Sequence, residues 1–150
     1  MRVVIQRVKE ALVSIDNKIF SQIKNGYLIY LGIENADNNT DIEWLTNKIM
    51  QLRIFSDNNG LMNKSIIDIG GEILVVSQFT LHAKTKKGNR PSFIHAAKPD
   101  VAIPLYQNFI KTLEQKMQKP VKSGKFGANM QIMSINDGPV TILIDTKNKE

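Results

Sequence analysis

Cysteine is absent from this 150-residue chain, and its absence removes several kinds of chemistry. Disulfide bonds, thiolate nucleophiles and cysteine-based zinc sites are all excluded. Neither of the two histidines, His82 and His95, is spaced from another ligand type in a way that would hold a metal. The sequence therefore gives no reason to expect a metal ion or any other cofactor.

Long apolar runs are missing as well. No segment approaches the ~20 apolar residues that cross a bilayer. The segment Met1–Glu10 alternates apolar with polar side chains, unlike the apolar block of a signal peptide. No linker, repeat or low-complexity tract divides the chain, so we expect one domain over residues 1–150, with the cytoplasm as its simplest location.

Acidic side chains are scarce in one part of the chain. The stretch from residue 82 to residue 125 contains ten lysines and arginines but only two acidic residues, Asp100 and Glu114. Its own net charge is therefore higher than the net charge of +6 of the whole chain. Such a distribution suits a surface that binds a polyanion, because neutralised phosphates release condensed counterions. A lysine-rich surface that only contacts water is an equally good interpretation of the charge alone.

Alternating apolar residues predict strands in the first third of the chain. Turn residues separate these strands, which indicates two hairpins. The strands are expected at Arg2–Val8, Leu12–Ile15, Ile19–Ile23 and Tyr27–Ile33, with turns at Asp16-Asn17 and Asn25-Gly26.

Helical spacing of apolar residues predicts two helices. The first is expected over Asp41–Leu52, where Thr40 and Glu43 have the form of a capping box. The second is expected to begin at Asp100, as its cap, and to run to about Gln118.

Three further strands complete the expected fold. One covers Glu72–Leu81, whose middle is apolar on both faces as in a covered central strand. The other two lie near Met130–Ile135 and Val140–Thr146, joined by a turn at 136–139. The order ββββ-α-β-α-ββ predicts an α/β fold with a mixed, strongly curved, barrel-like sheet and two packed helices.

General catalytic patterns are nearly absent. Thr80 and His82 would point to the same side of the expected strand, so a threonine nucleophile with a histidine base is conceivable. Such a pair on a strand is more often an ordinary half-exposed surface. Paired carboxylates and glycine-rich phosphate loops of a known pattern are not found.

Two segments carry a family resemblance that covers nearly the whole chain. Ser77-Gln78-Phe79-Thr80-Leu81 and, about 60 residues later, Asn136-Asp137-Gly138-Pro139-Val140-Thr141 resemble the two signature motifs of the D-aminoacyl-tRNA deacylases, first described as D-tyrosyl-tRNA deacylases. Further matching segments are Met1–Val8, Arg53–Asp57, Gly88–Phe93 and Gly124–Gly127, the last followed by Met130. A match to either motif alone would be weak evidence for the family. Both motifs in the right order, with these matching flanks, are specific evidence.

The resemblance implies hydrolysis of the ester that joins a D-amino acid, or mischarged glycine, to the 3′-terminal adenosine of tRNA. It implies that the backbone N–H of Phe79, with that of Thr80, holds the oxyanion. Thr80 is either a nucleophile or a positioning group beside a water that the terminal 2′-hydroxyl of the RNA activates. Ser77 and Gln78 would line and brace the pocket, or else satisfy polar groups on a buried strand.

The second motif implies a homodimer. In the family, a cis Gly-Pro corresponding to Gly138-Pro139 enters the pocket of the partner, where its carbonyl oxygens exclude an L side chain. Arg7 matches the arginine that braces this element. Phe126 and Met130 match the pocket wall, although such residues are more often part of a core.

Contacts to the acceptor stem are implied for six basic residues, which would position tRNA with little sequence reading. These residues are Lys84, Lys86, Lys87, Arg90, Lys122 and Lys125. Two alternatives stay open: a basic tRNA-binding module without catalysis, and a Thr80/His82 hydrolase of small esters. Aromatic residues make up only 7% of the chain, and no spaced aromatics form a stacking platform for RNA.

Overall fold

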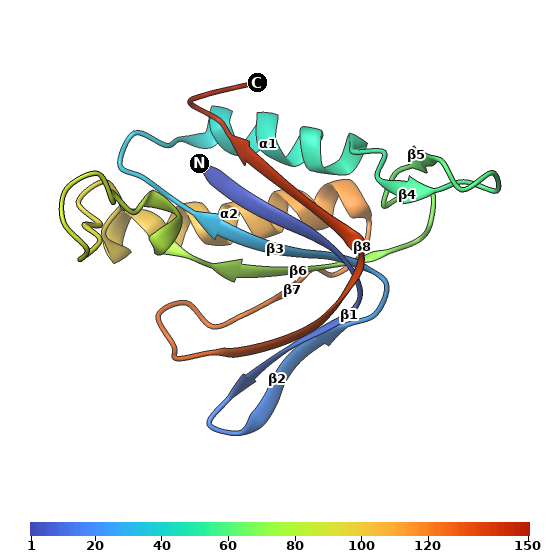
Figure 1. Ribbon diagram of the computed structural model, residues 1–150, viewed down its shortest axis with the longest axis horizontal. Coiled ribbons are helices and arrows are strands. Elements are labelled where there is room, and N and C mark those ends of the chain that lie inside the picture. The colour runs from blue at the N-terminus through green and yellow to red at the C-terminus, as the bar shows by residue number, and fades with distance from the viewer.

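The computed structural model describes all residues from 1 to 150. Its main feature is a strongly curved six-stranded sheet with two helices (Figure 1). The sheet contains β1 (Arg2–Ile15), β2 (Lys18–Ile23), β3 (Gly26–Gly32), β6 (Glu72–Ser77), β7 (Lys122–Ser123) and β8 (Gln131–Asp145). β1 is antiparallel to β2, β3 and β8, whereas β3–β6 and β6–β7 are parallel pairs. The mixed, barrel-like sheet and the two helices confirm the expected fold class.

The first strand is continuous, and the expectation of two strands at Arg2–Val8 and Leu12–Ile15 was wrong. Its first half pairs with β3 and its second half with β2. β8 runs along both halves. Backbone hydrogen bonds therefore extend the strand across the polar residues between the two apolar stretches.

The last strand is continuous too, so no turn at 136–139 reverses the chain. Val8 pairs with Asn136 and Gln6 pairs with Thr141, which leaves the intervening residues of β8 as a bulge. Although residues 136–139 are typical of a turn, they form a bulge here, because the residues before and after them both pair with β1.

The helices α1 (Asn39–Gln51) and α2 (Pro99–Met117) follow the predicted ranges closely, but both predicted caps were wrong. Asn38 and Asp41 form the capping box of α1, just ahead of the predicted pair Thr40 and Glu43. α2 starts after Lys98 without a side-chain cap, since Pro99 occupies its first position and has no N–H to satisfy. Neither helix has the length and apolar character needed to cross a membrane.

Both helices cover one face of the sheet, and the main core lies between them and β1, β3 and β6 (Figure 1). The middle of β6, Ile73–Val76, is fully buried, as expected for a covered central strand. A two-stranded hairpin of β4 (Phe55–Ser56) and β5 (Met62–Lys64) lies outside the main sheet. These short strands and β7 were not predicted, because two or three residues give no periodicity.

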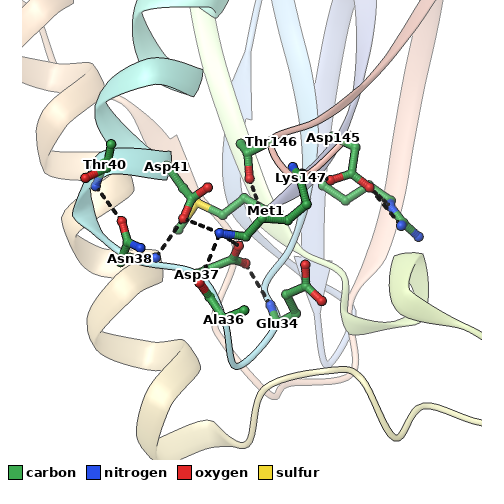
Figure 2. Close-up of polar contacts among 11 residues, drawn as sticks. Met1, Glu34, Ala36, Asp37, Asn38, Thr40, Asp41, Asp145, Thr146 and Lys147 are labelled. Carbon is green, nitrogen blue, oxygen red and sulfur yellow. Dashed lines mark hydrogen bonds and ion pairs between the residues drawn. The ribbon is translucent and has the colours of Figure 1, made fainter. Parts of the chain in front are cut away.

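A buried polar cluster fastens the start of β1 to the loop before α1 (Figure 2). The ammonium group of Met1 pairs with the carboxylate of Asp37 and donates to Thr146 Oγ1 at 2.6 Å. Lys147 Nζ lies 2.8 Å from Asp41 Oδ2. The cluster joins the first strand, α1 and the end of β8.

Candidate active site

The first motif leaves the sheet as a tight turn. Gln78 N donates to Leu31 O at 2.8 Å, which extends the β3–β6 pairing by one residue. β3 ends at Gly32, so no neighbour supports a longer strand, and the chain forms the 3₁₀ helix η1 (Phe79–His82). The expected strand Glu72–Leu81 therefore ends at Ser77.

The turn separates Thr80 from His82. Thr80 is exposed, whereas His82 is 4% exposed and its Nε2 has no hydrogen-bond partner. The side-chain hydrogen bond of Thr80 is with the Gln78 amide, which cannot act as a base. The idea that Thr80 and His82 share one side of a strand was wrong, and the structure offers no Thr-His dyad.

A pocket of about 320 Å³ lies beside this turn. Ser77, Gln78 and Phe79 form one part of its lining, and Phe126 and Met130 form another. The structure thus brings together five of the site residues singled out from the sequence. The remaining lining is mostly apolar and comes from Leu31, Ile33, Val76, Ala97, Ala102, Gly127, Ala128, Asn129 and Ile132.

Close packing fixes the wall of the pocket. A Cβ added to Gly124 would lie 2.5 Å from Met130 Sδ, so only glycine leaves room for the thioether where it is. Phe126 packs edge-on against Tyr106, with ring centroids 5.7 Å apart. Burial raises the pKa of Tyr106 far above its usual value, so its hydroxyl stays protonated and donates to Val75 O at 2.9 Å.

The rim of the pocket carries an exposed aromatic ring. Phe79 is 55% exposed, and its ring meets that of Phe93 edge-on at 5.0 Å. Phe93 belongs to the loop between η1 and α2, so the two rings tie the turn to that loop.

Gly138 and Pro139 lie elsewhere, in the bulge of β8, and do not line the pocket of their own chain. Both are exposed, and the peptide bond between them is cis. Gly138 has φ of +131°, and a Cβ there would lie 3.0 Å from Val140 N. An L side chain at this position would be both strained and crowded.

The side chain of Arg7 anchors this bulge. Its buried guanidinium donates through Nε to Asp137 O at 2.9 Å and pairs with the Asp137 carboxylate at 3.2 Å. Through Nη1 it also donates to Ile54 O, which follows α1. The bulge is thus fixed to the body of the protein by one arginine.

The six basic residues selected from the sequence are all exposed. Four of them, Lys84, Lys86, Lys87 and Arg90, belong to a loop that backbone hydrogen bonds between Lys84 and Ser92 close at its base. The other two, Lys122 and Lys125, lie in β7 and directly before the pocket residue Phe126. Positive charge therefore continues up to the pocket wall.

Residues 4–145, which include the pocket, the turn and the bulge, match the family model described as D-Tyr-tRNA(Tyr) deacylase. The chain belongs to this family. It is 61% identical to the D-aminoacyl-tRNA deacylase of Flavobacterium psychrophilum and 61% identical to that of Bacteroides fragilis, with both chains covered completely in each case. These findings confirm the resemblance, and the chain is a hydrolase of the ester bond in D-aminoacyl-tRNA.

Two solved structures share the fold. A protein described as c-Myc DNA unwinding element binding protein has a TM-score of 0.92 and 40% identity, covering 97% of this chain and 98% of its own. A probable eukaryotic D-amino acid tRNA deacylase has a TM-score of 0.81 and covers 95% and 97%, but at 20% identity it supports the fold alone.

Sequence reasoning missed two residues that shape the pocket and the turn. Gly124 was interpreted only as part of a matching segment, although a glycine close to two pocket residues is a signal for tight packing. Arg2 was interpreted only as the start of a strand and as part of a matching segment. Its Nη1 donates to Leu81 O in the turn at 2.6 Å, a long-range contact that nothing in the local pattern indicates.

Proposed function

We propose that this deacylase acts as a homodimer in which Gly138-Pro139 of each copy completes the pocket of the other. The proposal is carried by one observation: within a single chain, the two signature motifs lie apart. The pocket is lined by Ser77, Gln78 and Phe79, whereas Gly138 and Pro139 lie exposed in the bulge of β8 and do not line it. In a dimer, the bulge of one copy can lie against the pocket of the other.

Backbone amides of the turn provide the catalytic electrostatics. The first N–H groups of a helix have no acceptor within it, so those of Phe79 and Thr80 are free to hold the oxyanion of the ester. Ser77 and Gln78 line the pocket beneath them, and Gln78 orients the Thr80 hydroxyl.

Thr80 acts as a positioning group in this proposal. Its hydroxyl contacts an amide and has no base to activate it, which makes a nucleophilic role unfavourable. The terminal 2′-hydroxyl of the tRNA then helps to activate the attacking water. Phe126 and Met130 form the apolar wall against which the aminoacylated end lies.

Handedness is decided by exclusion. Carbonyl oxygens of the partner's Gly138 and neighbouring residues would lie beside the chiral centre, where an L side chain collides and a D side chain points away. Glycine has no side chain to exclude, so mischarged glycine is also a substrate. Arg7 supports this role because it immobilises the Asp137 carbonyl and, with it, the bulge.

The outer surface of β8 supports the dimer. β8 pairs only with β1 and leaves a 15-residue edge on which Met133, Ile135 and Leu143 are exposed by 65%, 50% and 65%. A long edge strand with apolar side chains is normally covered in a soluble protein. A second copy would cover it and bring the two motifs together.

The acceptor stem of tRNA would lie along the exposed basic residues of the loop and of β7. Lys84, Lys86, Lys87 and Arg90 are exposed in the loop after η1, and Lys122 and Lys125 are exposed shortly before the pocket residue Phe126. In Figure 1 the loop and the β7–β8 connection lie at the same end of the molecule.

A second candidate is nucleic-acid binding without catalysis. The exposed basic loop favours it, and a relative with 40% identity is named for binding a DNA element. Hydrolysis assays separate the candidates, since a binding module would retain charged D-Tyr-tRNA without releasing the amino acid.

The proposal is tested by deacylation of D-Tyr-tRNA and L-Tyr-tRNA and by mixing two variants. Ala128→Phe fills the pocket and Gly138→Ala distorts the bulge, so each variant alone should be inactive. After unfolding and refolding together, half of the dimers are mixed and hold one intact site of two, which restores roughly a quarter of wild-type activity. Absence of any recovery, together with a monomeric wild-type protein, would contradict the shared site.

A further inference from the structure

The 3₁₀ turn that presents Phe79 and Thr80 has little internal support. It is four residues long, and its backbone hydrogen bonds include those from Leu81 N to Gln78 O at 3.3 Å and from Ala83 N to Thr80 O at 3.0 Å. Short 3₁₀ segments have poor hydrogen-bond geometry. The orientation of its amides must therefore be fixed by contacts from outside the turn.

One side of the turn rests on β3. A Cβ added to Gly32 would lie 3.0 Å from His82 Cδ2 and from Leu81 Cβ, so the turn packs directly on the backbone of the strand. Apart from this packing, the side-chain hydrogen bond that reaches the turn from another element comes from Arg2. Its Nη1 donates to Leu81 O at 2.6 Å.

Arg2 is itself held in one orientation. Its Nε and Nη2 donate to Asp145 Oδ2 at 2.9 and 2.8 Å, and the two residues are direct partners in the β1–β8 pairing. Burial opposes ionisation of Asp145, but the Lys147 backbone N–H and Arg2 hold the pKa of this carboxyl below its usual value. The carboxylate is therefore charged at neutral pH, and Figure 2 shows it at the edge of the cluster around Met1.

We propose that Arg2 is a positioning residue for the deacylation, and that the Asp145–Arg2–Leu81 contact aligns the Phe79 and Thr80 amides with the scissile carbonyl. The inference rests on the proposed function, which assigns those amides to the oxyanion. Each of the three guanidinium nitrogens donates within the protein and the charge is paired with the Asp145 carboxylate, which favours positioning of the turn over binding of RNA phosphate. The same contact links the turn to β8, the strand that carries Gly138-Pro139.

Misplacement of a catalytic group by about 1 Å can cost on the order of 100-fold in rate. Arg2→Gln should therefore lower kcat on D-Tyr-tRNA by about 10-fold or more, because the turn loses its outer hydrogen bond while the pocket persists. KM for the tRNA should change by less than about 3-fold, and the dependence of binding on salt should stay as in the wild type. Arg2→Lys keeps the charge and one donor and should recover part of kcat.

Asp145→Asn separates positioning from RNA binding. If Arg2 positions the turn, weakening its anchor lowers kcat with little change in KM. If Arg2 contacts a phosphate instead, releasing it from the carboxylate lowers KM, and Arg2→Gln raises KM and reduces the salt dependence. That second pattern would overturn the inference.

Lys18→Gln is the matched control, since it removes one positive charge from an exposed residue at the start of β2. It should behave as the wild type. Hydrogen exchange gives an independent readout, in which the Ala83 amide loses protection in Arg2→Gln and not in Lys18→Gln. An active wild type with unchanged kcat in Arg2→Gln overturns this inference alone, whereas an inactive wild type overturns the proposed function and the inference together.

Discussion

The pocket and the Gly138-Pro139 bulge differ in how the fold holds them. The pocket is assembled from β3, β6, η1, the start of α2, the β7–β8 connection and the first residues of β8, and its wall packs into the main core. The bulge is part of a single edge strand, is exposed, and is held by Arg7 alone among charged side chains. A pocket can tolerate small shifts of one wall, whereas an exposed element that must exclude a side chain depends on one fixed backbone orientation. The two halves of the proposed site therefore have different weak points.

The bulge should be the more sensitive half. Gly138→Ala places a Cβ 3.1 Å from Arg7 Nη2 and 3.0 Å from Val140 N, at a φ of +131° that an L residue avoids. We expect kcat/KM for D-Tyr-tRNA to fall by about 100-fold, because the carbonyls and their arginine both move. Gly60→Ala is the matched control: its φ is +79°, but nothing lies within 4 Å of the added Cβ. Equal losses in the two variants would show that backbone strain alone, and not the bulge, is responsible.

The pocket should respond more mildly. Gly124→Ala displaces the flexible Met130 thioether, which lies 2.5 Å from the added Cβ, towards the cavity. KM for D-Tyr-tRNA should rise by about 10-fold while the preference for D over L is unchanged. Met130→Ala in the same chain removes the displaced group and should restore KM. A double variant as impaired as Gly124→Ala would place the damage in the backbone instead of the pocket wall.

Charge around the pocket should matter less than either half of the site. Lys86→Gln with Lys87→Gln removes two exposed cations from the loop. Binding of D- and L-charged tRNA should weaken equally, by a few-fold at moderate salt, and the slope of log K against log salt should fall by roughly 1 for each phosphate that the variant no longer neutralises. Unchanged slopes in a filter-binding series would remove this loop from the tRNA surface.

Acid should destabilise the whole fold, and therefore both halves of the proposed site, and it should have little effect near neutral pH. Burial opposes ionisation of Asp41, but hydrogen bonds from Lys147, Thr146 and the Asn38 backbone hold the pKa of this carboxyl below 3.8. A lowered pKa stabilises the fold above the unfolded-state value, and this contribution is lost as pH falls through the folded-state value. Tm should therefore be flat between about pH 7 and 5 and decline below about pH 4, with a smaller decline in Asp41→Asn. An Asp41→Asn protein with the same acid dependence would assign the effect to other carboxylates.

The periodicity of apolar residues predicted most of the fold. It failed where pairing with a neighbouring strand determines the conformation of a segment. α1 and α2 were found within two residues of their ends because their apolar stripes are long. The bulge at 136–139 has the residues of a turn, and only its pairing with β1 shows that the chain continues in one direction. Likewise, Phe79–His82 alternates as a strand would, but no neighbouring strand extends far enough to pair with it.

The site was predictable in composition and not in geometry. The two motifs pointed to Ser77–Thr80 and Gly138-Pro139, and the structure places the first beside Phe126 and Met130. The Thr80–His82 pairing failed because a 3₁₀ turn rotates successive side chains by about 120°, so residues two apart diverge. Contacts such as that of Arg2 with Leu81 join residues far apart in the sequence, and the local pattern gives no sign of them.

The pairing of β1 with β8 has a consequence for how the protein is made. Among the strands of this sheet, the first along the chain waits for the last, since β8 covers one whole edge of β1 from Arg2 to Ser14. Until then, Val3, Ile5 and Val8 lack part of the sheet that buries them. Contacts of such long sequence separation form slowly. During synthesis the unfinished chain therefore leaves the apolar side chains of β1 only partly covered until β8 has been added.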